Sequence, residues 1–407
     1  MILLIGIILM FQTFLSVKEL EPIHFPDVGT RASGFTLVSR STPQQLLVVQ
    51  GSGDGKIRIF DPRQKNQLFE RVVQKALHSG TFLQYHDRFF YFSRMLFWLD
   101  VNSLRLDSVV LRRDDYVRIS WEESRGRDVL VAIYTGGTDI YELNTLTYLQ
   151  TVQRDEDQQY DRPKIHDSVM VFQNKCNELQ AYDLLGRKIL WNLNSGTQTG
   201  YLYGIKIGTF RDFFLYYEIT RETGESFVVA TTIAGCLYKV RMSDGQVILK
   251  RERFKGKGNN AGLIGRFTLI DMNGDGIRDL VGGSVDYNVY CINGKDFSVL
   301  WEYNTGYENQ MPCSFADVNG DGTPDVFSVN DEYRLTVLDG RTGKLIYEMI
   351  VQEGVKKGWN QTEVLLADLN GNGRLNVVVI GGWNRLRVFE ISSVSVPKNE
   401  IVWIPKQ

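Results

Sequence analysis

The sequence predicts an all-β protein, and more narrowly a single β-propeller of seven or eight four-stranded blades. Three observations predict this: the apolar pattern has a period of two, β-branched residues dominate it, and similar groups of strands recur along the chain. The recurring unit is roughly 40 to 60 residues long, which is typical of one propeller blade. A long helical repeat is excluded, because its apolar residues would recur with a period of 3.6. One unit alone cannot bury both faces of its sheet, so the units are expected to pack round a central axis.

Length and composition fit this architecture. The chain has 407 residues, of which 43% are hydrophobic and 23% charged, and this is the composition of a globular protein. The formal net charge of −2 predicts no strong attraction to nucleic acid.

The N-terminal residues 1–17, MILLIGIILMFQTFLSV, are apolar for most of their length. A comfortable membrane span needs about 20 such residues, so the segment fits the core of a secretory signal peptide better. No Lys or Arg precedes the apolar run and no small-residue cleavage site follows it, so a retained anchor and a buried first strand remain alternatives. We expect residues 18–407 to form the propeller and no further segment to span a membrane. The chain is then secreted or luminal, or membrane-anchored if residues 1–17 are kept.

Eight units share the same order of strands and turns. The last three, residues 279–304, 325–350 and 376–391, align without a gap, so that Gly294 matches Gly340 and Trp301 matches Tyr347. Eight units predict eight blades. If residues 18–34 and 402–405 close the ring by sharing one blade, the predicted count is seven. The five earlier units are residues 46–63, 88–106, 128–149, 168–191 and 226–249.

A polar loop, DMNGDGIRD, stands between two short apolar segments near residue 275. Its oxygen-bearing residues fall at positions 1, 3, 5 and 9, and the backbone carbonyl of position 7 could join them. Ca²⁺ takes six to eight oxygen ligands of this kind. Position 12 is Gly282 rather than the Glu of the helix-loop-helix calcium motif, so we expect a calcium loop between strands, with a purely polar turn as the alternative. The predicted ligands are Asp271, Asn273, Asp275, Ile277 and Asp279.

The loop recurs twice. DVNGDGTPD begins 46 residues after the first loop, and its predicted ligands are Asp317, Asn319, Asp321, Thr323 and Asp325. DLNGNGRLN, 51 residues further on, has asparagine where the other loops have the aspartates of positions 5 and 9. Weak calcium binding and an empty turn both remain open for this third loop, whose residues are Asp368, Asn370, Asn372, Arg374 and Asn376.

The stretches DMNGDGIRDLVGGS and DVNGDGTPDVFSVN resemble the FG-GAP (integrin-α-like, VCBS-type) repeat. The stretch LDGRTGKLIYE (338–348) also resembles blades of quinoprotein-like propellers. The resemblance is clearest across residues 265–391 and is one of rhythm alone across 35–260. It implies that each loop joins the first two strands of a blade and binds Ca²⁺ there. Residues 218–226 lack the Asn-Gly turn, so no metal is expected in the preceding blade.

The sequence carries no recognisable catalytic constellation. His24, His78, His86 and His166 are isolated, and no nucleophile elbow or phosphate-binding loop is present. Four scattered cysteines, Cys176, Cys236, Cys291 and Cys313, predict neither a disulfide framework nor a zinc site, and both one or two bridges and free buried thiols remain open.

Two classes of function follow. The first is a non-enzymatic interaction module or scaffold subunit with a protein partner, or a glycan, and with calcium as a structural ion. Its candidate contact aromatics are Tyr201, Tyr203, Tyr287, Trp359 and Trp383, since Tyr and Trp are enriched at interface hot spots. The second is a propeller enzyme, either a quinoprotein-type oxidoreductase or a polysaccharide lyase. The adjacent cysteines of the quinoprotein dehydrogenases are absent, and no residue set points to a lyase, so the first class is favoured.

Overall fold

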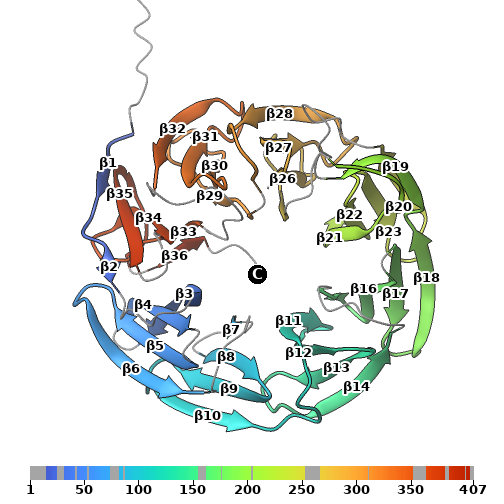
Figure 1. Ribbon diagram of the computed structural model, residues 1–407, viewed down its shortest axis with the longest axis horizontal. Coiled ribbons are helices and arrows are strands. Elements are labelled where there is room, and N and C mark those ends of the chain that lie inside the picture. Colours follow the sequence, from blue (N-terminus) through green and yellow to red (C-terminus); the bar gives the residue numbers. More distant parts are fainter. Residues whose placement is uncertain are drawn as a thin grey trace, which may run out of the picture.

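The chain forms a ring of β-sheets round a central axis (Figure 1). The computed structural model describes residues 15–24, 32–41, 44–52, 55–73, 82–85, 88–154, 162–175, 177–202, 205–252, 266–309, 311–351, 364–380, 385–398 and 400–403. These residues contain strands and turns, and among them no helix has the length and hydropathy that crossing a membrane requires.

The described strands build eight blades, numbered here in chain order, and each is an antiparallel sheet. In blades 1 to 7 the first strand lies nearest the axis. Blade 1 contains β3 (Ala32–Ser41), β4 (Gln44–Ser52), β5 (Lys56–Asp61) and β6 (Asn66–Val72). Blade 2 contains β7 (Phe82–Tyr85), β8 (Arg88–Ser93), β9 (Met95–Asp100) and β10 (Arg105–Val109). Blade 3 contains β11 (Arg118–Ser124), β12 (Arg127–Tyr134), β13 (Gly137–Glu142) and β14 (Tyr148–Gln153). Blade 4 contains β15 (Lys164–His166), β16 (Val169–Lys175), β17 (Glu178–Asp183) and β18 (Lys188–Asn194).

A two-stranded hairpin, which the sequence did not predict, lies in the chain between blade 4 and blade 5. It consists of β19 (Thr197–Leu202) and β20 (Ile205–Arg211). Blade 5 then contains β21 (Phe214–Glu222), β22 (Glu225–Thr232), β23 (Leu237–Arg241) and β24 (Val247–Arg251). Blade 6 contains β25 (Phe267–Ile270), β26 (Asp279–Gly283), β27 (Asn288–Ile292) and β28 (Val299–Asn304). Blade 7 contains β29 (Ser314–Ala316), β30 (Asp325–Val329), β31 (Arg334–Leu338) and β32 (Leu345–Ile350).

Blade 8 closes the ring with strands from both ends of the described chain. Its three central strands are β33 (Val364–Ala367), β34 (Arg374–Ile380) and β35 (Arg385–Ser395). On the outer side, β1 (Val17–Glu19) and β2 (Ile23–His24) pair with β35. On the inner side, β36 (Ile401–Trp403) pairs with β33. The predicted sharing of one blade is confirmed, but the count of seven that it implied is wrong, because the shared blade is the eighth.

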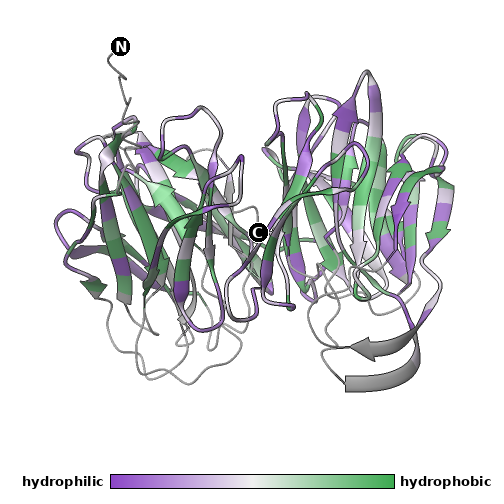
Figure 2. Cartoon of the chain, turned by 90° about the horizontal axis from the view of Figure 1, so that it is seen from above, coloured by the Kyte–Doolittle hydropathy of each residue, from purple (hydrophilic) through white to green (hydrophobic). Residues whose placement is uncertain are grey.

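Both faces of the middle strands are buried, so the core lies between the blades rather than at one centre. Each interface between successive blades holds a cluster of aliphatic and aromatic side chains, including the one between blade 8 and blade 1. Figure 2 shows the hydrophobic residues concentrated along the strands and the hydrophilic residues in the connecting segments. Alternate side chains of a middle strand therefore pack against the preceding and the following blade, as Val377 and Val378 do.

Antiparallel pairing places the connections of each blade at two opposite faces. One face, here called the loop face, carries residues 271–278, 317–324 and 368–373, each between the first and second strands of a blade. The other, here called the hairpin face, carries the turns between second and third strands, such as residues 284–288 and 330–334. The sequence prediction that each polar loop joins the first two strands of its blade is confirmed.

Candidate metal-binding loops

The first loop is held in shape by its own side chains. Asp271 follows β25, and its two carboxylate oxygens accept the N–H groups of Gly274 and Gly276 at 2.8 and 2.9 Å. Asn273 Oδ1 accepts the N–H of Asp275 at 2.9 Å. Asp275 Oδ1 accepts the N–H of Ile277 at 2.8 Å. Positions 1, 3 and 5 are thus brought together in one tight coil of the chain.

Two glycines allow the backbone to adopt this coiled conformation. Gly274 and Gly276 have φ of +75° and +82°, a region that residues with a Cβ avoid. A Cβ at either position would meet no other atom within 4 Å, so the requirement for glycine lies in the backbone angle and not in space.

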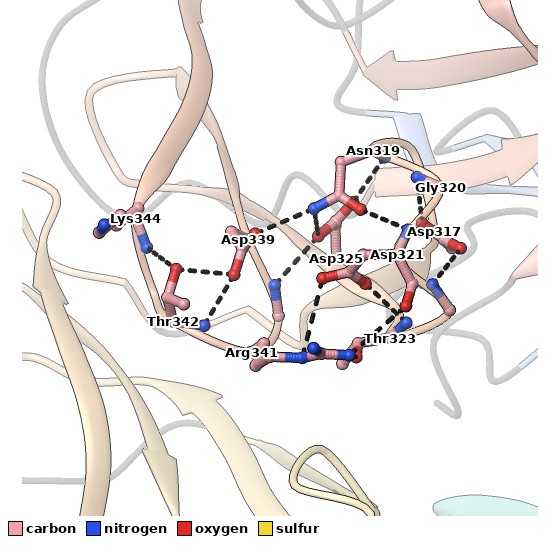
Figure 3. Close-up of polar contacts among 12 residues, drawn as sticks. Asp317, Asn319, Gly320, Asp321, Thr323, Asp325, Asp339, Arg341, Thr342 and Lys344 are labelled. Atoms are coloured by element: carbon pink, nitrogen blue, oxygen red, sulfur yellow. Dashed lines mark hydrogen bonds and ion pairs between the residues drawn. The ribbon is translucent and has the colours of Figure 1, made fainter. Parts of the chain in front are cut away.

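The second loop repeats this geometry (Figure 3). Asp317 accepts the N–H groups of Gly320 and Gly322 at 2.7 and 2.9 Å. Asn319 Oδ1 accepts from Asp321 N at 2.9 Å, and Asp321 Oδ1 accepts from Thr323 N at 2.8 Å. Sequence similarity between the two loops therefore extends to the same hydrogen bonds in the same order.

The ninth residue of each loop lies beneath the coil rather than on its open side. Asp279 is fully buried, and its oxygens accept the N–H groups of Met272 at 2.9 Å and Gly294 at 3.0 Å. Asp325 accepts from Val318 N at 2.8 Å and Gly340 N at 3.0 Å in the same way. This residue fastens the loop to the end of the third strand of its blade, a role that the spacing alone did not predict.

Burial changes the acidity of both ninth residues. Burial and, secondarily, the neighbouring Asp275 raise the pKa of Asp279 above its ordinary value. Burial raises the pKa of Asp325 to about 6, and the nearby Asp339 acts in the same direction. An adjacent cation would favour the ionised form of both carboxyl groups and lower these pKa values.

The third loop differs from the first two. Its first residue, Asp368, is fully buried, and its backbone N–H donates to Glu400 O at 2.9 Å, so the C-terminal segment covers this position. Asn370 and Asn372 turn their side-chain N–H groups toward Glu390 Oε2, at 3.1 and 2.6 Å. The remaining positions are Arg374, which is exposed, and Asn376, which is buried and accepts the N–H of Leu369 at 2.8 Å.

Two acidic residues near the loops were missed from the sequence. Asp339 Oδ2 accepts the side-chain N–H of Asn319 at 2.9 Å, and Glu390 occupies the corresponding place beside the third loop. Each stands 14 residues after the ninth loop position, where blade 6 has Asn293. The gap-free alignment of the repeats was the signal that could have found them.

The donor set suits a hard cation, because the first two loops present carboxylate, amide and carbonyl oxygens and no nitrogen or sulfur ligand. Across the described ranges, no three side chains among His, Cys, Asp and Glu gather closely enough to hold a metal ion by themselves. A cation at either loop would therefore also depend on the asparagine and backbone oxygens. Arg341 competes at the second loop, with Nε 3.9 Å from Asp321 Oδ2.

The remaining residues singled out in the sequence are the acidic residues of blade 5, the cysteines and the candidate contact aromatics. In blade 5, Glu218 and Glu222 form ion pairs with Lys164 and Lys239. Cys236, Cys291 and Cys313 are buried free thiols. Cys176, Tyr203, Trp359 and Trp383 lie outside the described residues, and Tyr201 lies in β19.

Comparison with solved structures supports the class of fold, a β-propeller. Solved structures of propeller shape cover nearly the whole chain, although the sequence identities are low enough that the likeness concerns the fold alone. They include Saccharomyces cerevisiae Sqt1 (14% identity, 94% of this chain and 100% of that chain, TM-score 0.65). The computationally designed Ika8 protein matches with 12% identity, 90% and 98% coverage and a TM-score of 0.60. BamB from Moraxella catarrhalis matches with 13% identity, 93% and 98% coverage and a TM-score of 0.54.

The repeats are then identified more narrowly. Residues 271–328 and 317–379 match the family described as FG-GAP-like repeat. No curated protein matches the sequence. The protein is an eight-bladed β-propeller that carries FG-GAP-like repeats from the first loop of blade 6 to the second strand of blade 8.

Proposed function

We propose that this chain is a calcium-stabilised propeller that acts as a protein-interaction module or scaffold subunit in a secreted or luminal setting. The observation that carries the proposal is the pair of loops at residues 271–279 and 317–325, which share both sequence and hydrogen bonds on one face of adjacent blades. Each loop combines two acidic residues with an asparagine at alternate positions, as a Ca²⁺ ligand set requires.

The proposed ligands of the first ion are Asp271, Asn273, Asp275, the backbone carbonyl of Ile277 and Asp279. The second ion would be held by the corresponding residues Asp317, Asn319, Asp321, Thr323 and Asp325. When bound, the ion supplies positive charge beside carboxylates that burial otherwise makes less acidic. We expect the third loop to hold no ion, because the C-terminal segment covers Asp368, Glu390 engages the side chains of Asn370 and Asn372, and two aspartates are replaced by asparagine.

The hairpin face supplies the proposed contact surface. Tyr287 and Tyr333 occupy the same turn position in blades 6 and 7, with φ of +76° and +61°. Blade 5 has Gly235 at this position, in a turn with the same backbone bonds. A bulky residue in this conformation costs on the order of 1–3 kcal/mol, which blade 5 avoids by having glycine there.

One of these tyrosines is part of a half-buried aromatic pair. The ring of Tyr287 stacks on that of Tyr307, with centroids 5.8 Å apart and planes 9° from parallel. A stacked, partly exposed tyrosine pair offers apolar area and hydroxyl groups together, which suits a protein partner, with a glycan as the other candidate.

The setting rests on the sequence of residues 1–17. We propose that this apolar segment directs export, either as a signal peptide or as a retained anchor. Extracellular and luminal calcium is high enough to fill loops of modest affinity.

Thermal unfolding tests the calcium part of the proposal. The purified chain should melt at a lower temperature in EGTA, and Ca²⁺ but not Mg²⁺ should restore the melting temperature. A ligand at a hundredfold excess over its Kd stabilises the folded state by about 2.7 kcal/mol per site. The double variant Asp275→Asn/Asp321→Asn should lose the response, whereas Asp296→Asn, at an exposed turn of blade 6, should keep it. An EGTA response that is absent, or equal in both variants, would overturn the proposal.

Stoichiometric co-purification tests the interaction part. A partner that elutes at a fixed ratio with the wild-type chain should be lost from Tyr287→Ala and retained by Tyr148→Ala, which removes a more exposed tyrosine from the outer strand of blade 3. Loss from both variants, or from neither, would count against the hairpin face.

A further inference from the structure

A cavity of about 420 Å³ lies within the ring, on the side of blades 4 to 6. Its walls come from the innermost strands β15, β21 and β25, from Pro312 before β29 and from Trp403 of β36. Figure 1 shows β21 and β36 on the inner side of the ring. Cavities of roughly 300–1,000 Å³ are typical of small-molecule sites. The residues that line the cavity do not include the tyrosine pair of the hairpin face. They do include Asp271, the first residue of the loop at 271–279.

The polar part of the wall is richer in cations than in anions. Its cationic residues are Arg162, Lys164, Arg266 and Arg278, and its anionic residues are Glu218 and Asp271. If Glu122, which lies 3.9 Å from Lys164 Nζ, is counted as well, four positive charges face three negative ones.

Lys164 is fixed in its charged state in this wall. Its Nζ lies 3.0 Å from Glu218 Oε1, and its side chain is 17% exposed. Burial acts to lower the pKa of Lys164, but Glu218 and Glu122 outweigh it and the pKa is raised. An arginine carries five N–H donors and an ammonium group three, so these cations can bond a ligand in addition to their protein partners.

The apolar part of the wall presents partly exposed hydrophobic side chains to the cavity. Leu215, Ile219, Leu269 and Trp403 are half-buried although they lie on the inner side of the ring. A ligand body that covered these side chains would remove apolar area from water, which stabilises the complex by roughly 25 cal/mol per Å².

We infer that this cavity binds a small organic anion with an aliphatic or aromatic body. The body lies against Leu215, Leu269 and Trp403, and the anionic group bonds the arginines of the wall. The size of the cavity limits the ligand to a small molecule, and the single excess positive charge favours a monoanion. This inference does not depend on a protein partner. Asp271 is shared with the first proposed calcium loop, so a bound Ca²⁺ would add to the positive charge of the wall.

A matched pair of fluorescent probes tests the inference on the full chain. 8-Anilinonaphthalene-1-sulfonate has an anionic group on an aromatic body, and N-phenyl-1-naphthylamine has the same rings without the sulfonate. We expect saturable binding of the sulfonate at one site, with quenching of tryptophan fluorescence, and binding of the neutral probe that is about tenfold weaker or more. Equal affinity for the two probes, or binding of the sulfonate without saturation, would overturn the inference.

Variants locate the site. Arg266→Gln should weaken binding of the sulfonate about tenfold, and Thr268→Trp, which fills the cavity from β25, should abolish it. If Arg266→Gln does not fold, Arg278→Gln replaces it in the test. Arg278 is exposed, and its substitution should weaken binding of the sulfonate at least threefold. Arg105→Gln, on the outer strand β10, is the matched control and should bind like the wild type. Unchanged affinity in the folded cavity variants, or an equal loss in the control, would show that the probe binds elsewhere.

Discussion

Gly294 and Gly340 stand where a Cβ atom would prevent the close contact between the third strand of the blade and its loop. The N–H of Gly294 donates to Asp279, and a Cβ at Gly294 would lie 2.0 Å from the backbone carbonyl oxygen of Arg278. At Gly340 the corresponding distance, to the carbonyl oxygen of Pro324, is also 2.0 Å. The glycines therefore allow the third strand to approach the loop closely enough for the buried aspartate to bridge them.

Gly294→Ala should lower the free energy of unfolding by about 3 kcal/mol, because the methyl group forces the turn away from Arg278 and breaks the bond to Asp279. Gly306→Ala is the control, since its φ of +84° makes alanine unfavourable but no atom lies within 4 Å of the added Cβ. It should cost about 1 kcal/mol. Urea unfolding measures both, and equal losses would show that crowding at Gly294 is unimportant.

Glu70 gives the protein a measurable dependence on pH. Its carboxylate lies 2.6 Å from Lys56 Nζ and 2.8 Å from Arg58 Nε. The hydrogen bond from Lys56, supported by Arg58 and opposed by burial, lowers the pKa of Glu70 below 4.5. A lowered folded-state pKa stabilises the fold above pH 4.5, and this contribution is lost as the pH falls through the folded-state value.

Glu70→Gln should therefore cost up to about 1 kcal/mol at pH 7, because the pair is partly exposed and screened by solvent. The difference from the wild type should vanish in acid, where Glu70 is protonated in both states. Urea midpoints between pH 3 and pH 7 measure it, and a difference that persists at the acid end would contradict the assignment. Glu225→Gln, at an exposed carboxylate 3.7 Å from Arg241, should have less effect throughout.

At the scale of elements, the seal of the ring rests on two short strands. Glu19 of β1 forms a bidentate ion pair with Arg387 of β35, with both contacts at 2.7 Å. Ile23 of β2 is 4% exposed and packs in the cluster between blade 8 and blade 1. Without these strands, the long strand β35 would present an unpaired edge, which favours aggregation.

A chain that begins at residue 25 should be less stable than one that begins at residue 15 by at least about 2 kcal/mol, the cost of exposing Ile23 alone. Urea unfolding compares the two truncated chains, and light scattering reports their association. Equal midpoints and equal scattering would mean that β1 and β2 do not contribute to closure.

Several elements could be predicted from sequence because they depend on local pattern. The loop at residues 271–279 and its flanking strands, the eight units and the closing segments follow from alternation, turn residues and repetition. The hairpin of β19 and β20 was missed, because it interrupts the repeat and has no counterpart elsewhere in the chain.

Features that depend on distant packing could not be read in this way. The cavity wall joins Lys164, Leu269 and Trp403 from three separate sheets. The burial of Asp368 arises from the C-terminal segment, whose position depends on the pairing of β36 inside the ring. Whether the loops bind calcium stays a prediction.

At the scale of the whole molecule, tryptophans couple neighbouring blades. Trp191 Nε1 donates to Met242 O at 2.8 Å, which joins blade 4 to blade 5. Trp301 Nε1 donates to Gly340 O at 2.8 Å, which joins blade 6 to blade 7. Since the last blade also packs on the first, each blade has two neighbours and no interface can open without exposing a shared core.

The ring should therefore unfold as one cooperative unit. We expect tryptophan fluorescence and far-UV circular dichroism to report coincident urea transitions, as a two-state system requires. Trp301→Phe should move both transitions to lower urea together. Separate transitions by the two probes would show that blades unfold independently, as in an open repeat array.

The shared eighth blade also bears on the order in which the protein can be made. β1 leaves the ribosome some 370 residues before its partner β35, as the pairing of Lys18 with Glu390 shows. Domains begin to fold during translation from the N-terminal end, so blades 1 to 7 can assemble while β1 waits. A polypeptide truncated before residue 385 would leave this strand without its partner. The open ring would then be a substrate for cellular proteases and chaperones.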